Sequence, residues 1–334
     1  MRAFLFAAFT VGFAAAAAAQ IEERSSIGAL PAHAAGVFEE IAACHVSPSG
    51  TYLVFDRRAH AVYTFARGGD TPRKIVQIGS ETGRIIRPTA FDSAPDGTFV
   101  VADAPGDQRR LQFFTASGSA LGGFTVAGRP VPLITLGNMT LSGLGSLKYT
   151  GRSILLSQPD TGALATEYGL NGAALRAFGE LRATGQEKDR AVHEALNMGL
   201  ALPVPGGGYY FVFLSGVPLF RKYDAAGKLL FERHIEGVEV DPYLSQMPGT
   251  WPRRRTDDGE IPLVPSMIRT AGVDADGNLW VSLVAPFTYV YDSSGEKRHT
   301  VRFRAAGIMA PTSFFFTPDA KVLVAPGCYT FSTK

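Results

Sequence analysis

The chain has 334 residues, with 32 Lys and Arg against 30 Asp and Glu, so its formal net charge is +2. This near-neutral balance gives no reason to expect a nucleic acid as partner, because proteins that bind nucleic acids usually carry a basic excess. Beyond the first 19 residues, no segment approaches 18 uninterrupted apolar residues, so we expect no membrane span.

Residues 1–19 have the composition of a secretory signal peptide. They contain one Arg and a short apolar run, and they end in Ala-x-Ala before Gln20. We expect cleavage after Ala19 and a secreted or periplasmic protein. The remaining length suits six repeats in one domain, which we expect to be a monomer.

The rest of the chain repeats one pattern six times. An apolar lead-in, a Pro or Asp, a Gly turn and an alternating strand form "VSPSGTYLVFD" (46–56) and "SAPDGTFVVAD" (93–103). The turns centre on Gly50, Gly97, Gly151, Gly207, Gly277 and Ala320, which are 43 to 70 residues apart. Most units add a second strand pair, such as "LFRKYDAAGKLLFERHI" (219–235). The pattern predicts an all-β, six-bladed β-propeller with four-stranded antiparallel blades over residues 44–334.

One turn, "VDADGNLWVSL" (273–283), also resembles half of a calcium loop. A calcium loop of the EF-hand type needs a Glu eleven residues after its first Asp, and that position is Ala285. The alternation of Leu279, Val281 and Leu283 favours a strand after the turn. We therefore interpret the stretch as a hairpin.

The blades resemble the NHL-repeat type of six-bladed propeller over residues 44–331. Residues 94–118 match the NHL pattern "PDG.lyVaD....rv..fd..G" closely. The resemblance implies the fold but no single activity, because such propellers include binding modules, metal-dependent lactonases and lyases.

The two ends of the chain are expected to meet in the ring. The last unit lacks an outer strand, which residues 25–33, within the N-terminal segment 20–43, would supply. Cys44 and Cys328 fall in neighbouring first and last blades, so a disulfide would join them across the ring closure. Two separate buried thiols are the alternative.

Arginines gather in the loops expected on one face of the propeller. They are Arg57, Arg58, Arg84, Arg87, Arg109 and Arg110. Guanidinium groups bind carboxylate or phosphate bidentately, so this sector is a candidate ligand-binding site. The alternative is that these side chains are solvated or paired with Asp56, Asp103 and Asp107.

Two insertions interrupt the repeats, at 180–202 and 236–270. The first reads as a short amphipathic helix with Val192, Leu196 and Leu200 buried. The second is Pro-rich, and Trp251, Arg253, Arg254 and Arg255 are candidate binding residues in it. It is either a structured flap over the binding face or a loop packed on the rim.

The residue pattern favours a binding or scaffolding protein over an enzyme, and it suggests no cofactor and no metal site. Its ligand would be a small anion, a peptide or a protein partner. A metal-dependent hydrolase or lyase resembling the lactonases, with Ca²⁺ or Zn²⁺ on the axis, is the alternative. Its axial candidates are Asp92, Asn197 and Asp274, but the acidic residue expected after the strand at 279–283 is missing. The six dispersed histidines lack zinc-binding spacing.

Overall fold

The computed structural model describes residues 21–47, 49–66, 71–106, 108–126, 134–136, 139–141, 143–256 and 259–334. The predicted signal peptide, 1–19, lies outside these residues, and so does Asp107. No helix in the described part of the chain is long and apolar enough to cross a membrane.

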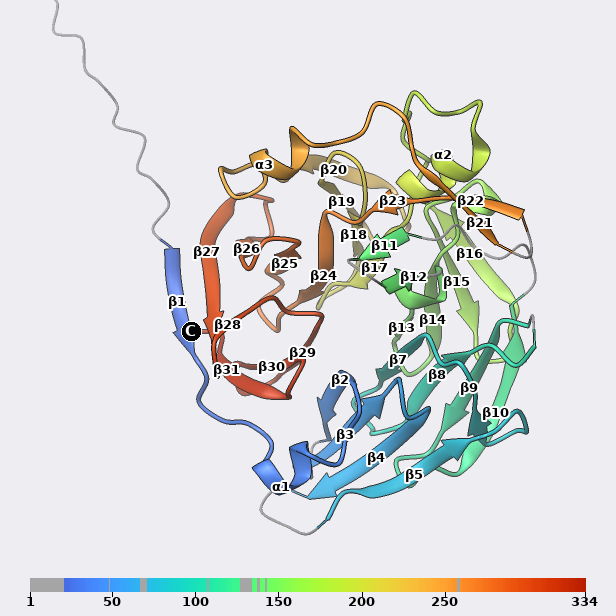
Figure 1. Cartoon of the computed structure of the whole chain (residues 1–334), viewed down its shortest axis with the longest axis vertical. Helices are drawn as coiled ribbons and strands as arrows, with labels where there is room; N and C mark the ends of the chain where they lie inside the picture. The colour runs from blue at the N-terminus through green and yellow to red at the C-terminus, as the bar shows by residue number, and fades with distance from the viewer. Residues whose placement is uncertain are drawn as a thin grey trace, which may run out of the picture.

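The chain forms a six-bladed β-propeller, as predicted (Figure 1). From the axis outward, the first three blades consist of β2 (Ile41–Val46), β3 (Thr51–Asp56), β4 (Ala61–Ala66) and β5 (Arg73–Ile78); β7 (Ala90–Ser93), β8 (Phe99–Asp103), β9 (Arg110–Phe114) and β10 (Ala120–Thr125); and β13 (Lys148–Tyr149), β14 (Ser153–Ser157), β15 (Ala165–Gly169) and β16 (Ala174–Phe178). The last three consist of β17 (Gly199–Pro203), β18 (Tyr209–Phe213), β19 (Leu219–Tyr223) and β20 (Leu229–His234); β24 (Ile268–Val273), β25 (Leu279–Leu283), β26 (Thr288–Tyr291) and β27 (Lys297–Arg304); and β29 (Ser313–Thr317), β30 (Lys321–Ala325) and β31 (Tyr329–Ser332).

Shorter elements connect the blades. They are β6 (Arg84–Ile85) beside β5, β28 (Ile308–Met309) beside β27, the helices α1 (Ala32–Ala35), α2 (Arg190–Leu196) and α3 (Asp241–Leu244), and 3₁₀ turns at Gly143–Ser146 and Pro159–Thr161. The helix expected in the insertion at 180–202 is therefore present as α2. Val192 and Leu196 are buried on α2 as predicted, whereas the buried Leu200 belongs to β17.

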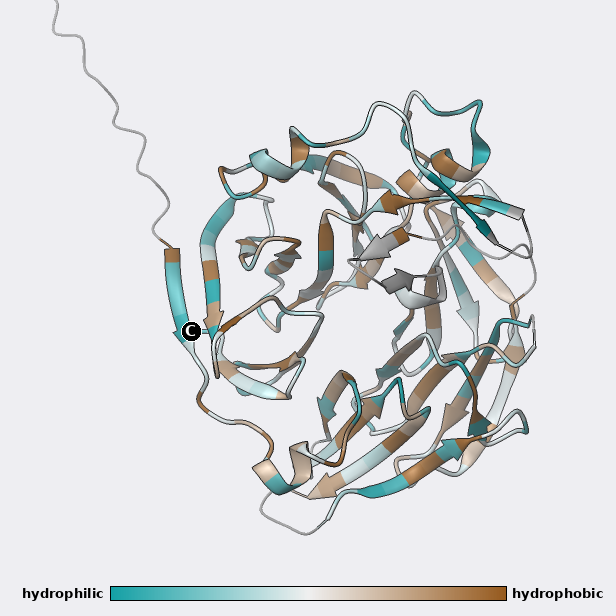
Figure 2. Cartoon of the chain, viewed as in Figure 1, coloured by the Kyte–Doolittle hydropathy of each residue, from teal (hydrophilic) through white to brown (hydrophobic). Residues whose placement is uncertain are grey.

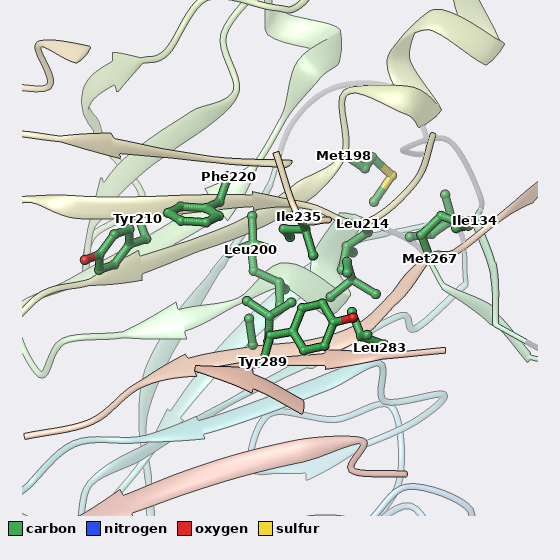
Figure 3. Packing of buried hydrophobic residues seen from close by; sticks show 14 of the residues in the cluster. Ile134, Met198, Leu200, Tyr210, Leu214, Phe220, Ile235, Met267, Leu283 and Tyr289 are labelled. Carbon is green, nitrogen blue, oxygen red and sulfur yellow. The ribbon is translucent and has the colours of Figure 1, made fainter. Parts of the chain in front are cut away.

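The burial of each strand follows from its place in the blade. The second strand has neighbouring blades on both sides, so every residue of β8, β14 and β25 is buried. The outermost strands face solvent, and Figure 2 shows hydrophilic residues along much of β1 (Ile21–Ser25) and β27. The largest apolar cluster packs blades 4 and 5 together around Leu200, Tyr210 and Tyr289 (Figure 3).

The hairpin turns adopt the backbone that the glycines were expected to supply. Gly97 and Gly277 have φ values of 84° and 83°, in the left-handed region that favours glycine. At Gly277, the turn links β24 and β25, so residues 273–283 are a hairpin. The Asp274 carboxylate accepts bonds from the turn's own backbone at Asp276 and Asn278.

The N-terminal segment joins the last two blades. β1 pairs in parallel with β27 on blade 5, outside the four strands of that blade (Figure 1). The chain then makes one antiparallel bridge to β31 of blade 6, between Gly28 and Thr330. β1 therefore extends blade 5. Residues 27–28 contact blade 6, which is the blade that was expected to lack an outer strand.

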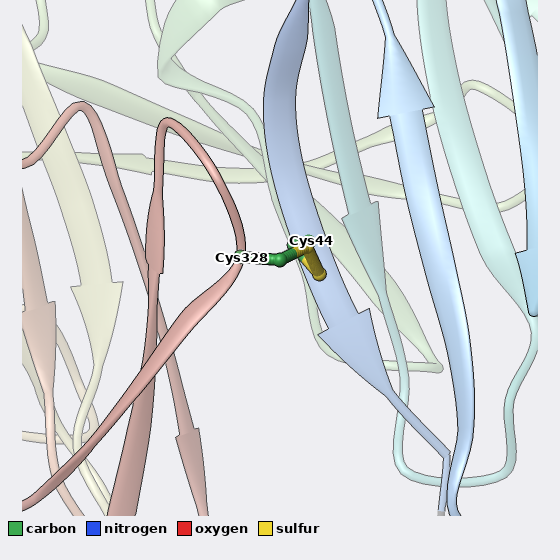
Figure 4. Close-up of a disulfide and its surroundings, with 2 residues drawn as sticks. All are labelled: Cys44 and Cys328. Carbon is green, nitrogen blue, oxygen red and sulfur yellow. A yellow bond between two sulfur atoms is a disulfide. The ribbon is translucent and has the colours of Figure 1, made fainter. Parts of the chain in front are cut away.

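A disulfide joins Cys44 and Cys328, which the sequence left open (Figure 4). Their Cα atoms are 5.6 Å apart, within the usual range for a disulfide. Cys44 lies in the innermost strand β2, and Cys328 lies in the turn between β30 and β31. The bond therefore connects blade 1 to blade 6, where the ring closes.

Candidate functional site

A cavity of about 370 Å³ lies at one end of the propeller axis, and we call it the axial cavity. All six blades contribute to it near the start of their first strands or just before them. Phe55, Phe91, Met198, Leu200 and Leu214 give it an apolar lining. Its volume is within the range of small-molecule sites.

Arg269 lines the axial cavity from a β-bulge in β24. The pairing of β24 with β25 shifts register between Ile268 and Thr270, so Arg269 is the extra residue. A bulge redirects a side chain relative to the regular alternation of the strand. Ile268 stays buried in the apolar cluster while Arg269 reaches the cavity.

The bonds of Arg269 leave its charge without a carboxylate. Its Nε and one terminal nitrogen donate to the Val284 carbonyl at 3.3 and 3.2 Å. Among the described residues it forms no ion pair. A guanidinium in this state can still bind an anion from solution.

Two other cations of the axial cavity face acidic partners. Arg57 forms a two-point ion pair with Glu40, which also lines the cavity. The Lys148 ammonium lies 3.8 Å from Asp92 Oδ2. Three cations and two carboxylates therefore leave a positive excess around the cavity.

A buried polar cluster lies on the axis beneath this cavity. His45 Nδ1 is 2.7 Å from Ser93 Oγ and 3.9 Å from Asp92 Oδ1. Burial, reinforced by the charge of Lys148, holds the pKa of His45 well below its ordinary value. Burial raises the pKa of Asp92, although Lys148 and the Tyr149 backbone N–H, which donates to Asp92 Oδ2 at 2.8 Å, oppose this effect.

The arginine sector predicted from the loops is largely tied to the protein itself. Arg110 donates twice to the buried Asp103, at 2.9 and 2.6 Å, and once to the Ser80 carbonyl at 2.6 Å. Arg87 donates to the Ala104 carbonyl at 2.9 Å. Arg58 is exposed and lies 3.7 Å from Glu39.

The other members of the sector do not converge on one point. Arg84 is exposed, and its backbone carbonyl accepts a bond from Arg110. Arg109 is buried towards blade 3, and this burial lowers its pKa while Asp160 opposes the change. Of the six predicted arginines, Arg57 is the one that lines the axial cavity.

The described part of the insertion at 236–270 forms regular structure that extends from α3 to α2 and β11 (Ile134–Leu136). Besides α3 it contains the hairpin of β21 (Arg253–Thr256) and β22 (Gly259–Pro262), followed by β23 (Val264–Pro265). β23 pairs in parallel with β11, which in turn pairs with β12 (Met139–Leu141). Ile134 lines the axial cavity, so this small sheet borders it.

Trp251 and the following arginines lie away from the axial cavity. Trp251 packs on the apolar cluster and lines a separate cavity of about 680 Å³ beside blade 4. Arg253 forms an ion pair with Asp189, which caps α2. Arg254 and Arg255 are exposed on β21. The predicted binding residues of the insertion therefore lie apart from Arg57, which lines the axial cavity.

The axial metal candidates do not gather in one place. Asp274 lies in its hairpin turn, and the Asn197 side chain bonds to the backbone of Arg182 and His193. Within the described ranges, no three His, Cys, Asp or Glu side chains are grouped as a metal site would require.

Arg269 and Lys148 are the cavity residues that sequence reasoning missed. Both belong to first strands, although Arg269 also falls within the predicted bounds of the second insertion, 236–270. The sequence "SMIRTAG" (266–272) places a lone Arg among the apolar and small residues of an inner strand, which is the available signal. The direction of the Arg269 side chain depends on the β-bulge in β24, which the sequence does not reveal.

No protein-family model and no curated protein matches the chain. A solved protein of unknown function from Bacteroides thetaiotaomicron is 11% identical, with a TM-score of 0.53 over 93% of this chain and 74% of that one. A calcium-binding protein, regucalcin, from Agrobacterium tumefaciens is 13% identical, with a TM-score of 0.49 over 93% and 95%. Virginiamycin B lyase from Staphylococcus aureus is 11% identical, with a TM-score of 0.48 over 86% and 78%. At 11% identity, the similarity to the Bacteroides thetaiotaomicron protein shows a shared fold and nothing more.

Proposed function

We propose that the chain is a binding protein that takes a small anionic ligand with an apolar body in the axial cavity. The observation that carries this proposal is Arg269, a cation at an apolar cavity whose hydrogen bonds go to a carbonyl and not to a carboxylate. An anion there would gain a charge-assisted hydrogen bond in partly desolvated surroundings.

The rest of the lining supports the same ligand class. The Lys148 ammonium lies 3.8 Å from Asp92 and has three N–H donors, so it can also donate a hydrogen bond to an anion in the cavity. Phe55, Phe91 and Met198 would contact the apolar part of the ligand. A peptide or protein partner is less well matched, because the cavity is about 370 Å³.

We further propose that the protein acts as a secreted or periplasmic monomer. Residues 1–19 supply the pattern of a signal peptide, and the Cys44–Cys328 disulfide suits an oxidising compartment. Binding is preferred to metal-dependent hydrolysis or lysis because the described residues present no group of three metal-binding side chains.

Calorimetry on the mature protein tests this function. The panel pairs hexanoate, octanoate and phenylacetate with their uncharged amides. We expect the carboxylates to bind, and Arg269→Gln to weaken them about tenfold or more, as expected for loss of a charged hydrogen bond. Arg269→Lys should retain part of the affinity, because it keeps the charge.

The matched control is Arg152→Gln, which removes an exposed arginine from the turn between β13 and β14. Its affinities should equal those of the wild type. The proposal is wrong if amides and carboxylates bind alike, if Arg269→Gln binds as tightly as the wild type, or if no carboxylate binds.

A further inference from the structure

A second cavity, of about 600 Å³, lies at blades 6, 1 and 2, and we call it the distal cavity. The first strands of these blades run from the axial cavity to the distal one. In β2, Ile41 lines the axial cavity and Val46 lines the distal one. In β7 the corresponding residues are Phe91 and Ser93, so the distal cavity opens on the opposite face.

The walls of the distal cavity are aromatic and aliphatic. Phe315 and Phe316 come from blade 6, and Tyr52 and Leu53 come from blade 1. Ile27 of the N-terminal segment completes the rim, with 58% of its surface exposed. Aromatic walls of this kind bind flat apolar molecules by stacking and edge contacts.

The polar lining of the distal cavity includes Ser93, together with Ser47, Thr317 and Thr330. The Ser93 hydroxyl is 2.7 Å from Nδ1 of the buried His45. The imidazole is stacked on Phe315, with ring centroids 4.3 Å apart. Because burial keeps the pKa of His45 low, the ring is neutral near pH 7, and the Ser93 hydroxyl can still bond to a ligand.

The charges of the distal cavity balance, unlike those of the axial cavity. Its two charged lining residues in the described chain are Asp319 and Lys321, and they form an ion pair at 2.5 Å. A charged ligand would therefore lose its hydration without gaining an unpaired partner.

We propose that the distal cavity is a second binding site, for an uncharged aromatic molecule that carries one hydrogen-bonding group. The ring of the ligand lies between Phe315 and Tyr52, and its polar group contacts the Ser93 hydroxyl. This site is independent of anion binding at the axial cavity, because no cation of that cavity lines it.

Three naphthalene probes distinguish the parts of this proposal in fluorescence and calorimetric titrations of the mature protein. They are 1-naphthol, 1-methylnaphthalene, which lacks the hydroxyl, and 1-naphthoate, which is charged. We expect saturable binding of one 1-naphthol per chain, tighter than that of either other probe. Octanoate should not displace it, and Arg269→Gln should not change its affinity.

Variants locate the bound probe. Ser93→Ala should weaken 1-naphthol about three- to tenfold, as for one neutral hydrogen bond, and leave 1-methylnaphthalene unchanged. Ser117→Ala, in the exposed turn between β9 and β10, is the matched control. Ile27→Ser, at the exposed rim, should weaken both uncharged probes without affecting the fold.

Three results would overturn the proposal. One is the absence of saturable 1-naphthol binding to the folded wild type. Another is equal affinity for 1-naphthol and 1-naphthoate. The third is 1-naphthol binding that neither Ser93→Ala nor Ile27→Ser changes, each variant having first been shown to melt cooperatively.

Discussion

Cys44 in the first blade is bonded to Cys328 in the last blade, across a sequence separation of 284 residues. Few single contacts constrain so much of a chain. A cross-link that closes so long a loop removes much of the conformational freedom of the unfolded state. The bond also holds β2 to blade 6, in which β30 and β31 lie on either side of Cys328.

We predict that the double variant Cys44→Ala/Cys328→Ala unfolds more easily than the wild type. The expected loss is roughly 2–5 kcal/mol of unfolding free energy. Urea denaturation of both proteins, with and without dithiothreitol, measures it. Reductant should lower the stability of the wild type and leave that of the variant unchanged; equal stability of the two oxidised proteins would contradict the prediction.

The Asp274 carboxylate is expected to stabilise its blade by accepting a bond from a buried indole. Asp274 Oδ2 lies 2.8 Å from Trp280 Nε1, in addition to the bonds that the carboxylate accepts within the turn. Asp274→Ala leaves the Trp280 N–H without this acceptor, which costs about 1–3 kcal/mol beyond the effect on the turn.

Asp224→Ala is the control for Asp274→Ala. Asp224 accepts bonds from two backbone N–H groups of its own turn, at Ala226 and Lys228, and from no buried indole. The difference between the two variants in chemical denaturation measures the combined contribution of the Trp280 indole and of the Asn278 side chain, which also donates to Asp274, at 2.9 Å. No difference would mean that these two bonds contribute nothing to stability.

Arg110 is predicted to be structural and not part of the binding site. Its removal in Arg110→Ala leaves Asp103 buried without its cation, with an expected loss of about 3–5 kcal/mol. Arg58→Ala, at an exposed position beside Glu39, should leave stability unchanged. Melting curves of the two variants test these stability changes. Where Arg110→Ala or Arg58→Ala is folded, its affinity for octanoate should equal that of the wild type.

His45 predicts a dependence of stability on pH. Its folded-state pKa lies below the unfolded value of about 6.5, so the unfolded chain takes up a proton first as the pH falls. The contribution of His45 is therefore constant above that pH and decreases below it, by up to about 1.4 kcal/mol per pH unit. Asp92 acts in the opposite direction, because its raised pKa makes the folded chain take up this proton at a higher pH than the unfolded chain does.

Comparison with His45→Gln isolates this effect, since glutamine keeps a polar group near Ser93 but does not titrate. Urea denaturation between pH 5 and 8 should show the wild type losing stability relative to the variant as the pH falls. Parallel curves across this range would show that burial of His45 imposes no such penalty.

Elemental analysis is expected to find only substoichiometric calcium and zinc in the purified mature protein. The melting temperature should then be the same before and after treatment with EDTA. A stoichiometric metal whose removal lowers the melting temperature would instead favour the metal-dependent hydrolase or lyase and would justify a screen of lactones and esters.

Local sequence determined the blades. Apolar alternation on both sides of Gly97 and Gly277 specifies hairpins, because each pattern acts over a few residues and the turns need a positive φ. Six such units in one chain then favour a closed ring, which buries the faces of all the blades. The amphipathic stretch around Val192 and Leu196 predicted α2 for the same local reason.

Only the tertiary structure decided which charges are available to a ligand. The sequence shows Arg57, Arg110 and Arg269 as equivalent cations. Folding pairs the first with Glu40 and the second with Asp103, and the bulge in β24 turns the third towards the axial cavity. Pairing and direction depend on residues that are distant in the chain, so local pattern determines the propeller and long-range contacts determine its candidate sites.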